Sequence, residues 1–157
     1  MLRKLFAALT LATFALVGVG AEPALAAVET TYNPVIDVVS DRTPNGGLGP
    51  RIGGAIRQLA EENQAQLVKD SIDKAFHLAG QFGQYNVIMI NLANHYVEQL
   101  NNKVLYANIR WDGIYYGLWV FDDGRFENQG KGGYENWGMV GWFDRPGNAG
   151  VVNFHRP

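Results

Sequence analysis

The chain has 157 residues, no cysteine, 13 basic and 15 acidic side chains, and a formal net charge of −2. This length is enough for one domain with one hydrophobic core. The lack of cysteine excludes disulfide bridges, thiol catalysis and thiolate metal sites, and the lack of a basic run argues against a nucleic-acid partner.

Residues 1–26 have the pattern of a secretory signal peptide. Arg3 and Lys4 precede an apolar run from Leu5 to about Val19, and Ala24-Leu25-Ala26 offers small residues for cleavage. An uncleaved membrane anchor is the alternative, but the run is shorter than the ~20 residues of a spanning helix. We therefore expect a secreted, extracellular protein without a transmembrane anchor after cleavage. Export of a cysteine-free chain favours a bacterial source.

Residues 27–54 are predicted to be an extended, glycine- and proline-rich segment, followed by a single α+β domain over residues 55–157. Asn33-Pro34 suits the start of a short helical turn, since asparagine favours the cap and proline the first turn. The prolines and glycines between Thr43 and Gly54 indicate a flexible connection.

Residues 55–79 are predicted to form one long helix. Its apolar stripe consists of Ile56, Leu59, Ala60, Leu67, Ile72, Ala75, Phe76 and Ala79. Asn63 and Gln64 interrupt the stripe and allow a break, and Gly80 is a suitable stop. The helix either packs on the domain's own sheet or binds a partner or membrane. Its mixed, slightly acidic polar face favours packing.

The C-terminal half is predicted to form strands. Tyr85–Leu92 is a continuous apolar run that suits a central strand buried on both faces, and residues 91–102 are expected to be a connection. Residues 104–121 are predicted to form a hairpin, and Asp122-Asp123-Gly124 a second turn. Further strands are expected at residues 125–128, 137–143 and 151–154. The predicted fold is α+β, with the long N-terminal helix packed on a five- or six-stranded antiparallel meander sheet.

The hairpin has a register that the Asp112-Gly113 turn determines. Pairing Trp111 with Ile114 gives a mostly aliphatic face, in which Ile109 lies opposite Tyr116, Ala107 opposite Leu118 and Leu105 opposite Val120. The other face pairs Arg110 with Tyr115, Asn108 with Gly117 and Tyr106 with Trp119. Gly117 would leave a slot among larger side chains. This second face is either a recognition surface or a second core, because aromatic residues serve both purposes.

The segment from Asn128 to Trp137 is the most unusual loop, because three glycines flank Lys131. It is either a ligand-contacting loop or a wide connection whose glycines allow positive φ. Aromatic rings can stack on sugar C–H groups, while amide and charged side chains bond to hydroxyls. The candidate ligand-binding residues are Tyr106, Asn108, Arg110, Tyr115, Trp119, Tyr134, Glu135, Asn136 and Trp137.

Metal, cofactor and catalytic sites are not predicted. His95 and Glu98 are three residues apart, but His77 and His155 lie far away, and no paired histidine motif exists. Neither serine lies in a nucleophile elbow. Carboxylates such as Glu127 and Glu135 keep a small glycan hydrolase as an alternative.

Five segments of the region 85–154 resemble small exported bacterial proteins called "stress proteins". They are YNVIMINL, DGIYYGLWVFDDGRF, GKGGYENW, GWFDRPGN and VVNF. The resemblance implies an exported β-rich module and carries no catalytic residue to this chain.

Together these features predict a secreted, non-enzymatic binding module for a polysaccharide or cell-envelope component. The alternatives are an exported protein-interaction factor, such as an inhibitor or toxin-like effector, and a stress-related secreted protein.

Overall fold

The structure, a computed structural model, describes residues 32–61, 63–147 and 149–157. The predicted signal peptide lies outside the described residues. The elements follow in the order β1 (Val35–Asp41), a 3-10 turn (Pro44–Gly46), α1 (Leu48–Arg57), α2 (Gln64–Ala79), β2 (Asn86–Asn91), β3 (Tyr96–Asn101), β4 (Leu105–Trp111), β5 (Ile114–Phe121), β6 (Asp123–Asn128), β7 (Trp137–Val140), β8 (Phe143–Asp144) and β9 (Val151–Phe154).

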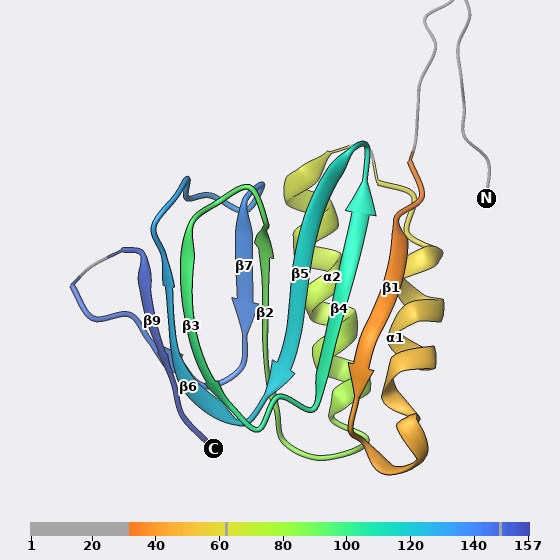
Figure 1. Cartoon of the computed structure of the whole chain (residues 1–157), viewed down its shortest axis with the longest axis horizontal. Helices are drawn as coiled ribbons and strands as arrows, with labels where there is room; N and C mark the ends of the chain where they lie inside the picture. The colour runs from red at the N-terminus through yellow and green to blue at the C-terminus, as the bar shows by residue number, and fades with distance from the viewer. Residues whose placement is uncertain (1–31, 62, 148) are drawn as a thin grey trace, which may run out of the picture.

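The strands form two antiparallel sheets, so the predicted single meander is wrong. The first sheet has five strands in the order β1-β4-β5-β2-β7, and the second has four in the order β3-β6-β9-β8 (Figure 1). The predicted turn at 122–124 does not form a hairpin, because β6 begins at Asp123 and pairs with β3 and β9 instead of β5. The predicted connection at 91–102 contains β3. Its inward Tyr96, Glu98 and Leu100 alternate with exposed residues.

The predicted long helix 55–79 is also wrong, because two shorter helices occupy this part of the chain. The α1 helix ends at Arg57, and Asn63 begins α2 in an extended conformation, with its side-chain oxygen accepting from the Gln66 N–H. Neither helix, nor any other in the described part of the chain, is long and apolar enough to cross a membrane.

Residues 33–54 are ordered into a strand and a helix, instead of the predicted helical turn and flexible connection. Val35–Asp41 pairs along β4, with Ile36 opposite Ile109. The start of α1 is held by the Asp41 carboxylate, which accepts from the Thr43 hydroxyl at 2.6 Å and the Gly49 N–H at 2.5 Å. Burial by itself would raise the pKa of Asp41, but hydrogen bonds from Thr43, Gly49 and Leu48 together lower it.

The β4–β5 hairpin has the predicted register in every pair, from Leu105 opposite Val120 to Trp111 opposite Ile114. Asp112 (φ 46°) and Gly113 (φ 76°) both have positive φ, which is the conformation of a type I′ turn. The central position predicted for the strand at 85–92 is also confirmed, because β2 lies between β5 and β7.

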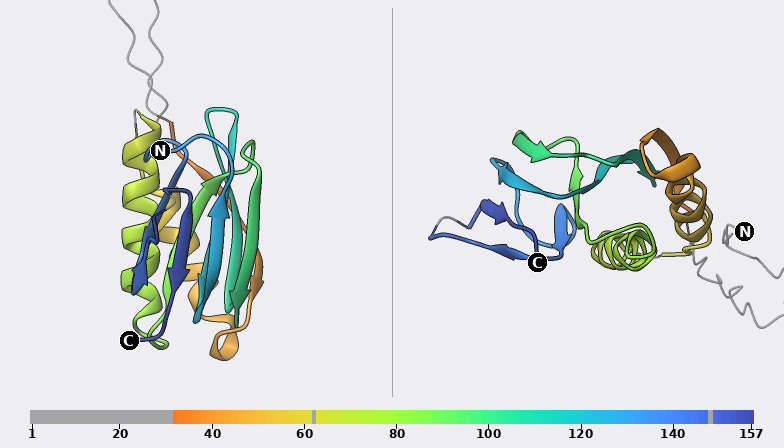
Figure 2. Two further views of the ribbon diagram at one scale, coloured as in Figure 1. Left: turned by 90° about the vertical axis from the view of Figure 1, so that its left-hand side faces the viewer. Right: turned by 90° about the horizontal axis from the view of Figure 1, so that it is seen from below.

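The five-stranded sheet separates two hydrophobic cores. On one side, Leu105, Ala107 and Ile109 pack with the apolar faces of both helices. On the other side, Trp119 and Phe121 pack against Phe126 of the second sheet. Figures 1 and 2 show the helices on one side of the five-stranded sheet and the second sheet standing against its β2–β7 half.

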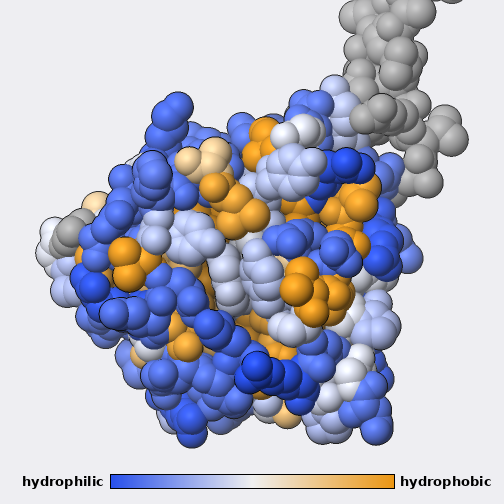
Figure 3. Space-filling view, viewed as in Figure 1, coloured by the Kyte–Doolittle hydropathy of each residue, from blue (hydrophilic) through white to orange (hydrophobic). Residues whose placement is uncertain are grey.

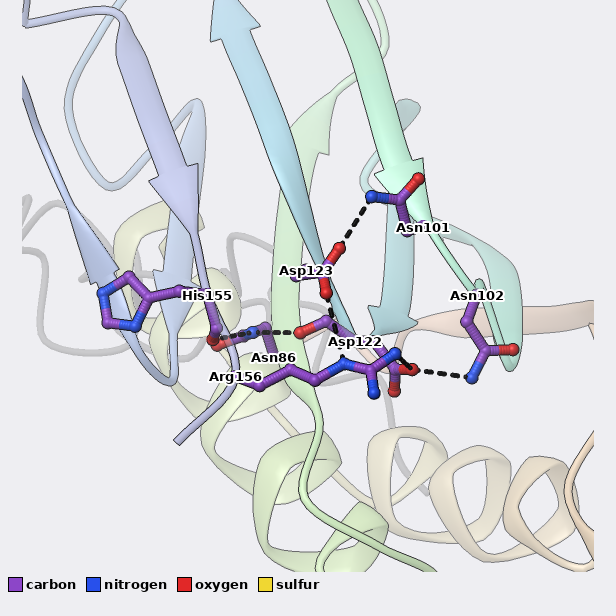
Figure 4. A network of polar contacts seen from close by, with 7 residues as sticks. All are labelled: Asn86, Asn101, Asn102, Asp122, Asp123, His155 and Arg156. Carbon is purple, nitrogen blue, oxygen red and sulfur yellow. Dashed lines mark hydrogen bonds and ion pairs between the residues drawn. The ribbon is translucent and has the colours of Figure 1, made fainter.

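The predicted strand at 137–143 is divided into β7 and β8 by a bend at Gly141. Asn86 causes the close approach there, since a Cβ on Gly141 would lie 2.1 Å from the Asn86 amide oxygen. The Asn86 amide donates to the carbonyls of Asp122 (2.7 Å) and His155 (3.1 Å), and its oxygen accepts from the Trp142 N–H (2.6 Å). Figure 4 shows this fully buried side chain between the segments it joins.

The C-terminus is attached at the same place. Arg156 forms ion pairs with Asp122 at 2.6 Å and with Asp123 at 3.2 Å (Figure 4). Asn101 and Asn102 donate to the same two carboxylates. The end of β9 is thereby connected to the crossing from the first sheet to the second.

Candidate functional site

The predicted aromatic surface on the hairpin is mostly a second core. Trp119 is 6% exposed, and its ring lies 4.8 Å from Tyr106 and 6.0 Å from Phe126, centroid to centroid. Trp137, 5% exposed, packs in the same cluster. Of the two alternatives for the hairpin face, Trp119 therefore follows the second core, because the second sheet covers it.

The predicted slot at Gly117 is filled from within. A Cβ on Gly117 would lie 2.7 Å from the Trp119 ring, so the glycine makes room for the indole and not for a ligand. Tyr106 and Asn108 are half-buried, and the Tyr106 hydroxyl donates to the Asn108 side chain at 2.6 Å. Arg110 and Tyr115 remain exposed. The hairpin face thus keeps only its outer residues accessible.

The predicted glycine-rich loop, by contrast, borders a cavity of about 660 Å³. The cavity opens beside β7, where the edge of the first sheet meets the second sheet and the loop before β9. Its lining side chains come from β6, the loop, β7, β8 and the following turn: Glu127, Asn128, Gln129, Tyr134, Trp137, Met139, Phe143 and Arg145. The structure therefore brings Tyr134 and Trp137 together and leaves the hairpin candidates elsewhere.

Asparagine side chains hold the loop wall in place. The Asn94 amide donates to the Asn128 side chain at 3.1 Å and to the Lys131 carbonyl at 2.9 Å. Asn128 donates to the same carbonyl, and its oxygen accepts from the Gly130 N–H, both at 2.9 Å. Asn136 donates to the Gly132 carbonyl at 2.8 Å. Asn136, a predicted ligand contact, is thus 8% exposed and engaged within the loop.

The loop is also held from the hairpin side. The Tyr116 hydroxyl donates to the Glu135 carbonyl at 3.1 Å and accepts from the Gln64 amide at 3.2 Å. Burial raises the pKa of this hydroxyl, so it remains protonated and able to donate. The predicted candidate Glu135 is exposed and enters the loop through its backbone carbonyl. The loop is accordingly a preformed wall and not a loose connection.

Two cations lie over aromatic rings of the cavity lining, one from Arg145 in the lining and one from Lys69 outside it. The Arg145 guanidinium lies 5.3 Å from the Trp137 ring centroid, and the Lys69 ammonium lies 4.5 Å from that of Tyr134. Arg145 also donates to the Ala149 carbonyl. Glu127 is paired with Arg125 at 3.0 Å. Arg145 has several further N–H donors for a bound molecule, whereas the Glu127 carboxylate is already engaged.

The sequence patterns pointed to the loop and, through the hydrolase alternative, to Glu127, but missed Asn94 and Arg145. These residues belong to segments that only the two-sheet topology brings to one place. The asparagines at 91, 94, 128 and 136 were the available signal, because this residue type commonly bonds to loop backbone. No group of three histidine, aspartate or glutamate side chains suited to a metal ion occurs in the described ranges.

The protein matches the Stress response protein YvgO of Bacillus subtilis (strain 168), with 42% identity over 111 residues. The chain is therefore similar to a stress response protein. The alignment covers 71% of this chain and 65% of the relative, so the chain spans less than two-thirds of that protein's length. The aligned stretch is longer than the region 85–154 that carries the predicted resemblance. No protein-family model and no solved structure matches the chain.

Proposed function

We propose that the protein is a non-catalytic binding protein that takes an oligosaccharide of the cell envelope into the cavity beside β7. The observation that carries this proposal is the cavity of about 660 Å³ with a wall fixed by asparagine side chains. Small-molecule sites typically have volumes of about 300–1,000 Å³ and are largely formed before the ligand binds. A preformed wall lowers the entropy lost on binding.

The lining supplies both kinds of contact that a sugar needs. Tyr134 is 52% exposed and offers a flat ring face, and Trp137 is also among the lining residues. Arg145 and Gln129 offer hydrogen-bond donors to hydroxyl or carboxylate groups. This mixture of flat apolar surface and directional polar groups favours a carbohydrate over a wholly apolar ligand.

The carboxylates favour binding over hydrolysis. Among the described residues that line the cavity, Glu127 is the one carboxylate, and Arg125 already pairs with it. Glycoside hydrolysis ordinarily requires two carboxyl groups on opposite sides of the scissile bond. The proposal therefore assigns no bond-breaking step to this cavity.

An envelope ligand requires an exported protein, and the relative's name connects it with a stress response. We therefore propose that binding takes place outside the cytoplasm, as part of a stress response. N-terminal sequencing of the protein from the culture medium tests this: a mature chain that begins near Ala27 is expected. A chain that stays in the cytoplasm with Met1 in place would contradict export.

The binding test compares two tyrosines that are equally exposed, at 52%, in different places. Isothermal titration with soluble peptidoglycan fragments is carried out on wild type, Tyr134→Ala and Tyr115→Ala. We expect Tyr134→Ala to weaken binding about tenfold or more, because it removes the ring at the cavity mouth. Tyr115→Ala should leave the affinity within about twofold of wild type.

If Tyr115→Ala weakened binding and Tyr134→Ala did not, the binding site would lie on the hairpin face instead of in the cavity. Absence of binding by wild type to these fragments and to neutral glucan oligosaccharides would refute the carbohydrate proposal. Arg145→Gln gives a second reading, because it keeps a polar side chain and removes the cation above Trp137. It should weaken binding of acidic fragments more than that of neutral ones.

A further inference from the structure

The five-stranded sheet is covered on only part of the side opposite the helices. The second sheet packs over β2, β5 and β7, through residues such as Ile88, Trp119 and Trp137. It does not extend over the outer part of β1 and β4 (Figures 1 and 2). We name the resulting surface the open face: Val35, Asp37 and Val39 of β1, Asn108 and Arg110 of β4, and Tyr115 of β5.

Apolar side chains gather on the open face. Val35 is 52% exposed, Val39 55% and Tyr115 52%, and these are three of the five exposed large hydrophobic residues in the described part of the chain. Figure 3 shows this side of the molecule, with apolar surface between polar residues over β1 and β4. Exposed apolar groups gathered within a polar surround are typical of a protein contact.

Two opposite charges lie among these residues. The register places Val35 opposite Arg110 and Asp37 opposite Asn108, so Asp37 and Arg110 are diagonal neighbours on one face. Both are exposed, and within the described residues neither side chain has a hydrogen bond or an ion pair. The open face thus carries one unpaired carboxylate and one unpaired guanidinium beside its apolar side chains.

We infer that the open face is the contact surface of a symmetric homodimer. A two-fold axis between the two charges places Asp37 of one subunit against Arg110 of the partner subunit, and the same operation forms the second pair. The valines and Tyr115 then lie within the same contact, against the open face of the partner subunit, and leave water. The open face carries both a carboxylate and a guanidinium, so it is complementary in charge to a second copy of itself. A second copy of this chain is therefore the partner that we infer.

The edge of β1 is less suited to pairing than its face. Arg57 donates to the Ile36 carbonyl at 3.2 Å, and the register shifts between Val38 and Ser40. Bulges and covering side chains are devices that hinder the addition of another strand. Contact between two open faces therefore buries their apolar side chains without adding a strand to either sheet.

The test is a charge exchange, measured by analytical ultracentrifugation of the purified protein over a wide concentration range. Asp37→Arg and Arg110→Asp should each weaken dimerisation about tenfold or more, because each creates like charges across the contact. The double variant restores opposite charges and should return to within about threefold of wild type. Thermal unfolding of each variant shows that the fold is retained.

A matched pair of valines tests the apolar contribution. Val35→Lys should abolish the dimer, whereas Val97→Lys, on an exposed position of β3, should leave it unchanged. A wild type that stays monomeric at every concentration overturns the proposal. So does a double charge variant that associates no better than the single ones. The outcome does not depend on whether the cavity beside β7 binds a carbohydrate.

Discussion

Replacing the buried Asn86 should lower the free energy of unfolding by an amount that depends on the hydrogen bonds lost. For an Asp replacement, this loss should also depend on pH. Asn86→Ala removes two donated bonds and one accepted bond, all to backbone groups of other segments. Each such bond contributes about 1 kcal/mol net, so the free energy of unfolding should fall by about 2–4 kcal/mol.

Asn86→Asp keeps the size of the side chain and the acceptor for the Trp142 N–H. Its second carboxylate oxygen, however, would face the carbonyls of Asp122 and His155 without a proton to donate. A buried charge without compensation typically costs about 3–5 kcal/mol, so the Asp variant should be less stable than the Ala variant at pH 7. A protonated carboxyl can donate one bond, which lowers the loss to about 1–2 kcal/mol in acid.

The pH dependence has a defined sign. Burial and the two carbonyls favour the neutral carboxyl, so the folded state binds its proton more tightly than the unfolded state. The difference in stability between the variant and wild type therefore grows as the pH rises and shrinks as it falls. Urea unfolding of wild type and both variants at pH 7 and pH 4.5 measures this difference in the free energy of unfolding. A loss in Asn86→Asp that is equal at the two pH values would refute the reasoning.

Four further substitutions test other parts of the fold by urea unfolding. Trp119→Ala should lower the free energy of unfolding by about 3–5 kcal/mol, because it empties part of the second core, and a soluble quencher should not reach this indole in wild type. Asp41→Asn should cost about 1 kcal/mol at neutral pH by weakening the start of α1. Because hydrogen bonds lower the pKa of Asp41 against the effect of burial, wild type should lose this advantage as the pH falls through that lowered pKa. Gly124→Ala, at φ +128° with a Cβ position 2.3 Å from the Gln99 carbonyl, should destabilise the protein severely, whereas Gly113→Ala, with φ +76° and open space, should cost about 1 kcal/mol.

The hairpin was predictable because its information is local. Asp112-Gly113 determines the turn, the turn determines the register, and the register assigns each side chain to a face. What covers a face is not local information. Trp119 alternates in the same way whether it meets solvent or Phe126, so the sequence left a recognition surface and a second core as alternatives.

The helices and the outer strands show the same limit. The stripe from Ile56 to Ala79 continues across the break because Leu59 is buried as well, although it lies between α1 and α2. The β3 strand carries Tyr96 and Leu100 inward but also Glu98, which hides its alternation. Short strands whose partners are distant in sequence depend on tertiary context more than on their own composition.

Only the loop wall of the cavity was predictable from the sequence. The glycines around Lys131 marked the loop, and Tyr134 and Trp137 are among the residues that line the cavity. Arg145 was not among the predicted residues, since nothing near it in sequence indicates that its guanidinium lies over Trp137. That proximity arises from the return of β9 to β6, and it follows from the order of the strands in the second sheet.

The pairing of β1 with β4 has a consequence for the order of folding. Asp41 must find Leu105, whereas Trp111 and Ile114 are separated only by a two-residue turn. Loop-closure entropy therefore favours early formation of the β4–β5 hairpin and late docking of β1. During synthesis, the valine-rich β1 leaves the ribosome before β4 and stays unpaired until β4 has been made. Until then it is the segment most exposed to aggregation, and a chaperone that holds nascent chains would be expected to bind there.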